Sequence, residues 1–183
     1  MDKTAKLLRV AKEIENCEIC KVGKSGKAVV GEGNPDAKVV FIGEAPGKNE
    51  ALTGRPFIGR SGKYLRSQIV SIGLKESEVY ITSPVKYLPD RGTPTSEDIA
   101  HGKIHLDKQL GVIKPKIVVL LGRVAAEGVL GRKVEVMKEH GKIIDRRDNV
   151  SYFLTLHPAA VMRFQKNKPF FESDFKKLKA LSI

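Results

Sequence analysis

The feature that most constrains the fold of this chain is an unbroken apolar run, Ile117-Val118-Val119-Leu120-Leu121, between Lys116 and Gly122. A run without polar alternation is typical of a strand that is buried on both faces. Further strands are expected at 39–42, 79–82 and 150–156. Helical spacing of apolar residues, with start and stop signals, predicts helices at 3–16, 62–73, 96–111, 125–130 and 169–181. Alternating strands and helices predict a mainly parallel sheet covered on both faces, in one domain of residues 1–183.

The charge balance favours a polyanionic partner. The chain has 33 Lys and Arg against 21 Asp and Glu, a net charge of +12. A Lys-rich surface that serves only solubility or heat stability is the alternative. No apolar stretch approaches the ~18 residues needed to cross a bilayer, and the N-terminus has no apolar signal region. The sequence therefore predicts a cytoplasmic protein without membrane contact.

Two loops are expected at the same edge of this sheet. The stretch 43–59 follows the strand at 39–42, and His157 follows the strand at 150–156. Open α/β sheets bind ligands at the carboxyl ends of their strands, so the two loops predict a composite cleft. Taken alone, the first loop is also consistent with a tight turn that carries solvated carboxylates, and a lone histidine is more often structural than catalytic. No P-loop, G-x-S-x-G elbow or H-E-x-x-H motif is present.

Two motifs carry a resemblance to a known family. They are Gly43-Glu44-Ala45-Pro46-Gly47 with Glu50 and Gly54-Arg55-Pro56-Phe57-Ile58-Gly59, and Leu156-His157-Pro158-Ala159 with Arg163. Together they closely resemble the uracil-DNA glycosylases of the iron–sulfur family, called family four, over residues 13–164. The resemblance implies a three-layer α/β/α fold with a central four-stranded, mainly parallel sheet, and DNA that crosses the strand ends.

The resemblance also implies roles for individual residues. A neutral His157 would donate to the oxyanion that develops on the departing base, helped by backbone N–H groups of 43–47. Glu50 would position the hydrolytic water and Glu44 would line the base pocket. Phe57 would stack on a flipped base. Gly43, Ala45 and Ser83 complete the expected base-binding set, and the expected DNA contacts are Arg55, Arg163 and an apolar wedge of Val161 and Met162.

One departure from the family lies in the expected base pocket. The family has Asn at the position of Ser83, and its side-chain amide contacts the edge of uracil. A single hydroxyl cannot make the two contacts that an amide makes. The sequence therefore leaves another deaminated base open as the substrate.

The second departure concerns a metal site. The family binds a [4Fe–4S] cluster through four cysteines; Cys17 and Cys20 match two of them, while Tyr87 and Gly102 or a neighbour stand at the other two positions. His101 and His105, four residues apart on an expected helix, complete a Cys2His2 set with the local spacing of a structural zinc site. Three hypotheses follow: a zinc ion, a decayed corner without metal, or a cluster with ligands other than cysteine.

The sequence thus predicts a monomeric DNA glycosylase that hydrolyses the N-glycosidic bond of uracil in DNA and starts base-excision repair, with no cofactor in the chemistry. The rival from another class is a non-catalytic protein that binds DNA or a damaged base.

Overall fold

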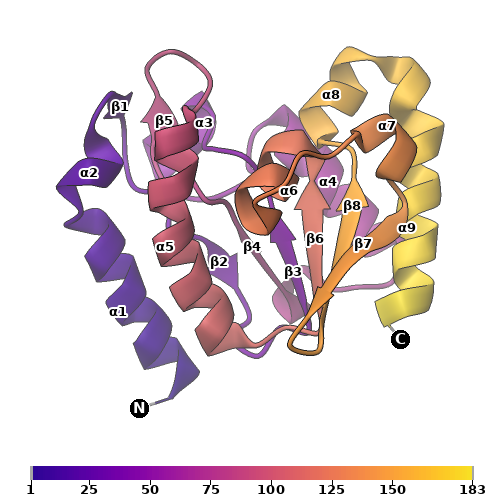
Figure 1. Ribbon diagram of the computed structural model, residues 1–183, viewed down its shortest axis with the longest axis horizontal. Coiled ribbons are helices and arrows are strands. Elements are labelled where there is room, and N and C mark those ends of the chain that lie inside the picture. Colours follow the sequence, from indigo (N-terminus) through magenta and orange to yellow (C-terminus); the bar gives the residue numbers. More distant parts are fainter. Residues whose placement is uncertain (1, 183) are drawn as a thin grey trace.

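The computed structural model describes residues 2–182 and is built on a six-stranded sheet with the strand order β2-β4-β3-β6-β8-β7 (Figure 1). The strands are β2 (Glu32–Gly33), β3 (Val39–Ile42), β4 (Val79–Thr82), β6 (Ile117–Leu121), β7 (Lys142–Arg147) and β8 (Val150–Thr155). The inner four strands, β4, β3, β6 and β8, are parallel. The predicted mainly parallel sheet is confirmed, and two antiparallel edge strands extend it.

Helices cover both faces of this sheet. One layer contains α4 (Arg60–Ser71), α8 (Pro158–Arg163) and α9 (Lys168–Ser182), and the other contains α1 (Lys3–Glu15), α5 (Ser96–Ile113) and α6 (Gly122–Leu130). The short helices are α2 (Glu18–Lys21), α3 (Lys48–Thr53), α7 (Val136–Glu139), η1 (Glu76–Glu78) and η2 (Gln165–Asn167). The predicted three-layer α/β/α arrangement is therefore confirmed.

The two faces of each inner strand form two separate apolar cores, because successive side chains of a strand point to opposite faces. Phe41 and Val119 pack with Leu65 of α4 and Phe175 of α9. On the other face, a second group includes Val40, Ile42, Val118 and Leu120 with Leu106 of α5 and Ala126 of α6. This two-sided burial explains why the inner strands are unbroken apolar runs.

One edge of the sheet is formed by a β-hairpin that the sequence analysis did not predict. β7 pairs antiparallel with β8, and the turn between them places Asp148 and Asn149 at φ values of 48° and 66°. Two positive φ values in a two-residue loop are the requirement of the hairpin turn that matches strand twist. Because β7 is partly exposed and carries charged residues, it lacks the apolar run that identified the inner strands.

The N-terminal segment lies along α5. Helix α1 packs on α5, and α2 leads into β1 (Lys24–Ser25), which pairs antiparallel with β5 (Leu88–Pro89). Within the described residues, no helix is both long and apolar enough to span a membrane.

Candidate active site

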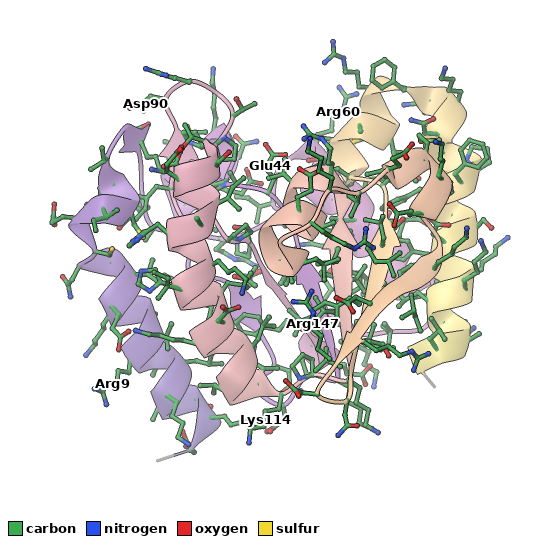
Figure 2. The ribbon with its side chains drawn as sticks, viewed as in Figure 1. Arg9, Glu44, Arg60, Asp90, Lys114 and Arg147 are labelled. Atoms are coloured by element: carbon green, nitrogen blue, oxygen red, sulfur yellow. The ribbon has the colours of Figure 1, made fainter. Side chains whose placement is uncertain are left out.

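A cavity of about 300 Å³ lies where the parallel strands end. It brings together most of the predicted catalytic and base-binding residues: Glu44, Ala45, Glu50, Phe57, Ser83 and His157. These come from the segments after β3, β4 and β8, as the strand order requires. In Figure 2, Glu44 and Arg60 lie toward this edge of the molecule, whereas Lys114 lies toward the opposite edge. The expected composite cleft therefore exists as a cavity.

Phe57 is held in an unusual backbone conformation against the start of the first loop. Its φ is +50°, which is uncommon for an aromatic residue. A Cβ added to Gly43 would lie 2.4 Å from the Phe57 ring, so this glycine leaves space for the ring, and a base contact by Gly43 stays a prediction. Arg66 donates to the carbonyl oxygens of Pro56 and Phe57, each at 2.9 Å. Arg66 thus fixes the ring's backbone, a role that sequence analysis missed because the arginine lies on a helix outside both motifs.

The Glu50 carboxylate binds the backbone that follows Phe57. Its Oε1 accepts hydrogen bonds from the amides of Ile58 and Gly59 at 2.8 and 2.7 Å, and its Oε2 accepts from the amide of Gly47 at 3.2 Å. An ionised carboxylate offers about four acceptor sites, so three bonds leave about one for a water molecule. Glu50 therefore organises the cavity wall.

Glu44 lines the cavity without such a network. Burial raises the pKa of its carboxyl, and the positive charge of Arg123 partly offsets that effect. A half-buried carboxylate that faces a cavity is available to a substrate or to a water molecule.

His157 is at once the N-cap of α8 and a wall of the cavity. Its Nδ1 accepts a hydrogen bond from the amide of Ala159 at 3.2 Å, so in the neutral ring the proton is on Nε2. Burial lowers the pKa of His157 to about 4. The ring centroid lies 6.1 Å from that of Phe57. His157 is therefore an uncharged ring beside an aromatic face at neutral pH, and its role as a donor to the base stays a prediction.

The backbone donors differ from the expectation. The amide of Gly43 donates to Thr82 O at 2.9 Å, and that of Gly47 donates to Glu50. Pro46 has no amide hydrogen, which leaves Glu44 and Ala45 as the donors of this loop that are not already engaged in these bonds. The prediction that the whole loop 43–47 supplies donors is corrected to these two amides.

Ser83 lies at the end of β4 with its hydroxyl already engaged. The hydroxyl donates to Val85 O at 2.8 Å, so only its lone pairs remain to contact a ligand. Behind it, the fully buried Lys86 donates to Thr82 Oγ1 at 2.7 Å and to Gln109 Oε1 at 2.8 Å. Burial lowers the pKa of Lys86 to about 7. This buried hydrogen-bond network, which the sequence analysis also missed, stabilises the part of the cavity wall that contains Ser83.

A basic groove adjoins the cavity. It has a volume of about 410 Å³, shares Gly47, Glu50, Ser61 and Ala159 with the cavity, and is also lined by Lys48, Arg60, Met162 and Arg163. The predicted DNA-contacting residues Met162 and Arg163 therefore lie next to the base-binding residues. Lys48 and Arg60 were not singled out from the sequence, because isolated basic residues carry no motif.

Two of the predicted DNA contacts are placed elsewhere. Val161 is 1% exposed and belongs to the core, so the prediction that it enters the base stack is wrong. Arg55 forms a bidentate contact with Glu32, at 2.9 and 3.1 Å, and lines neither the cavity nor the groove; its role in DNA binding stays a prediction. Burial opposes ionisation of Glu32, but the hydrogen bonds from Arg55 and Arg66 lower its pKa overall. Phe164, 49% exposed beside Arg163, is an apolar side chain that the sequence analysis overlooked.

The predicted metal ligands also meet. Cys17, Cys20, His101 and His105, hereafter the Cys/His corner, each offer one potential ligand atom, and these atoms lie within 4.8 Å of one another. The corner joins α2 to α5, away from the cavity, and none of its residues lines that cavity. It is thus a group that can bind a metal outside the candidate catalytic centre.

The fold and the cavity define an α/β/α protein with a pocket lined by an aromatic ring, a histidine and two glutamates. Residues 30–179 match the model of the uracil DNA glycosylase superfamily. The chain is 36% identical to a type-4 uracil-DNA glycosylase of Sulfurisphaera tokodaii, over 97% of this chain and 85% of the relative. It is also 36% identical to the type-4 enzyme of Archaeoglobus fulgidus, over 92% and 89% of the two chains. The chain belongs to the uracil DNA glycosylase superfamily, in the type-4 family.

A type-5 uracil-DNA glycosylase of Pyrobaculum aerophilum is 30% identical over 73% of this chain and 66% of the relative. The similarity to type 4 covers more of the chain.

Proposed function

We propose that this protein removes uracil from DNA by hydrolysing the bond between N1 of the base and C1′ of the deoxyribose. Water supplies the hydroxyl that remains on C1′ and the proton that the base takes up, and the products are free uracil and an abasic site. The observation that carries the proposal is the single cavity that holds Phe57, His157, Glu44 and Ser83 together. The type-4 relatives support the same assignment.

His157 stabilises the departing base. When the glycosidic bond breaks, its electron pair passes to the base and negative charge develops on the pyrimidine oxygens. The Nε2–H of neutral His157 donates to one of these oxygens, and the amides of Glu44 and Ala45 supplement it. Because the ring is neutral before the reaction, it acts through a preorganised hydrogen bond aimed at the position where the negative charge develops.

We assign the hydrolytic water to Glu44 and a positioning role to Glu50. The carboxylate of Glu50 already accepts three backbone hydrogen bonds, whereas burial and the neighbouring cavity are the main features of the Glu44 environment. A carboxylate beside C1′ also stabilises the positive charge that develops on the sugar. This assignment moves to Glu44 the water-positioning role that the sequence predicted for Glu50.

Phe57 and Ser83 recognise the base. Phe57 provides the face on which a flipped base stacks. The hydroxyl of Ser83 donates to Val85, so its lone pairs accept from a base N–H. Uracil has a hydrogen on N3, whereas unprotonated cytosine has none there. Hypoxanthine and xanthine also carry an N–H at the matching edge and stay a second candidate substrate. Thymine and guanine carry one as well, so this contact distinguishes uracil from cytosine at N3 but not from every undamaged base.

The basic groove binds the phosphates that flank the flipped nucleotide. Lys48, Arg60 and Arg163 line it, and the overall charge of +12 attracts the DNA backbone. Met162 and the exposed Phe164 are the apolar side chains placed to fill the vacated stack. We propose that the protein acts as a monomer in the cytoplasm, and that no cofactor takes part in the reaction.

A base-release assay tests this function. Single- and double-stranded oligonucleotides that carry one uracil, hypoxanthine or xanthine are incubated with the protein, and abasic sites are then cleaved with alkali. We expect strand breaks at uracil, and His157→Ala is expected to lower the rate by about 10²-fold or more. Binding without strand breaks at any of the three bases would favour the non-catalytic alternative.

A further inference from the structure

The Cys/His corner contains a buried histidine, His105, whose ring nitrogens have no hydrogen bond to the part of the chain that the structure describes. Both ring nitrogens of His105 are buried, and neither has a hydrogen-bond partner among the described residues. Burying an imidazole without hydrogen bonds is costly. Cys17 Sγ lies 3.1 Å from His101 Nε2, and the rings of His101 and His105 are nearly perpendicular with centroids 5.6 Å apart. The donors are gathered around one point, but nothing in the described chain satisfies His105.

A four-iron cluster does not fit this corner. Each cysteine of such a cluster binds a different iron, so its ligand atoms surround eight atoms and lie farther apart than the ligands of one ion. Tyr87, at a family cysteine position, is 6% exposed and packs with Val10, Ile14 and Cys20. A Cβ on Gly102, at or next to the other position, would lie 2.1 Å from Pro84 O, which excludes any side chain there. The space for the third and fourth cysteines is closed.

A single tetrahedral ion fits. With zinc–sulfur bonds of about 2.3 Å and zinc–nitrogen bonds of about 2.0–2.1 Å, tetrahedral ligand atoms lie about 3.3–3.8 Å apart. The four donors are already within 4.8 Å of one another, so small side-chain movements complete the geometry. Two thiolates and two imidazoles in a tetrahedron around one ion are a ligand set typical of structural zinc sites. We propose that Cys17, Cys20, His101 and His105 bind one structural zinc ion in place of the cluster that the family resemblance implies.

The position of the Cys/His corner shows which parts of the fold a bound zinc ion would connect. Cys17 and Cys20 belong to the start of α2 and to α2 itself, and both histidines lie on α5. Just after α2, β1 pairs with β5, which lies within the segment 83–95. That segment contributes Ser83 and Gly92 to the cavity. Zinc would thus fasten α2 to α5, next to the segment that carries part of the proposed base-binding wall.

Metal analysis of the wild-type protein tests the proposal without relying on glycosylase activity. The protein is purified without added metal, and zinc and iron are measured per chain. We expect about one zinc and no iron. After the metal is stripped, titration with Co²⁺ is expected to produce the visible absorption of a tetrahedral cobalt–thiolate site at one equivalent. Titration with Zn²⁺ is expected to raise the unfolding temperature by roughly 5–10 °C.

Variants identify the ligands. Cys20→Ser and His105→Ala are expected to lose most of the zinc, whereas Tyr87→Phe, which removes a neighbouring hydroxyl but no ligand atom, is expected to keep it. If the ligand variants do not fold, the Co²⁺ and Zn²⁺ titrations of the metal-stripped wild type still show whether the protein binds zinc. Several irons per chain with broad visible absorption would overturn the proposal in favour of a cluster. Absence of both metals, with no response to Zn²⁺ or Co²⁺, would overturn it in favour of a decayed corner.

Discussion

Replacing Glu50 with Gln separates a positioning role from a chemical one. The Glu50 carboxylate accepts from the amides of Ile58, Gly59 and Gly47 at 2.8, 2.7 and 3.2 Å. Glutamine keeps one oxygen for the first two donors but presents an NH2 group to the Gly47 amide, and it loses the charge that strengthens all three bonds. Hydrogen bonds to charged groups contribute about 1.5–3 kcal/mol each, so we expect a loss of about 2 kcal/mol. For a domain of this size, that loss lowers the unfolding temperature by about 4–8 °C.

The matched control is Glu44→Gln, which changes the other cavity carboxylate by the same atoms. Thermal unfolding and the uracil-release assay are measured on both variants under identical conditions. We expect Glu44→Gln to unfold within about 2 °C of the wild type and to lose about 10²-fold in turnover, because it removes the carboxylate that orients water. Glu50→Gln is expected to lose both stability and activity, because the wall of the cavity relaxes.

One pattern of results would refute this assignment. If Glu50→Gln unfolds at the wild-type temperature yet abolishes turnover, while Glu44→Gln stays active, the three backbone bonds contribute little and Glu50 is the residue that acts on water. The original sequence-based assignment of the two glutamates would then hold.

Three further outcomes follow from the site. Because burial raises the pKa of Glu44, the acid limb of kcat should lie above pH 4.5 and disappear in Glu44→Gln; a limb retained in that variant would contradict the role given to Glu44. The pKa of His157 is lowered to about 4 in the folded protein, so as the pH drops below about 6.5 the unfolded chain takes up a proton on this ring before the folded protein does. The free energy of unfolding should therefore be unaffected by this group above about pH 6.5 and fall as the pH drops toward 4. Denaturant titrations of wild type and His157→Gln test this, and parallel pH profiles would refute it. Arg60→Gln should weaken DNA binding at every sequence and reduce the salt slope by about 1, as measured by fluorescence anisotropy; an unchanged slope would remove Arg60 from the phosphate contacts.

The sequence predicted the parts of the fold that depend on apolar runs. Strands buried on both faces leave an unmistakable pattern, as in 117–121. Helix α8 was missed because Pro158 looks like a breaker, although proline is well suited to the first turn of a helix that His157 caps. The same omission explains the error at Val161, since only the helix shows that this position faces the core.

The sequence predicted which residues line the site, but not the hydrogen bonds that connect them. Motif spacing identified Glu44, Glu50, Phe57 and His157, and strand order brought them to one cavity. The Glu50 carboxylate acts by accepting hydrogen bonds from three backbone amides, and a residue pattern does not show which amides a side chain contacts. Arg66 is similar, because it acts on two carbonyl oxygens from a neighbouring helix.

One position from each departure from the family lies in the same segment between β4 and α5. Ser83 and Tyr87 lie four residues apart between β4 and α5, and Lys86 is buried between them. Ser83 bonds back to Val85, Lys86 ties the segment to Thr82 and Gln109, and Tyr87 packs against Cys20 and reaches Glu15 O at 3.4 Å. These contacts hold the segment against α1, α2 and α5, and the proposed zinc ion would join α2 to α5 beside it. A change at the metal corner and a change in the base-binding wall are therefore expected to be coupled, although they lie at different sites.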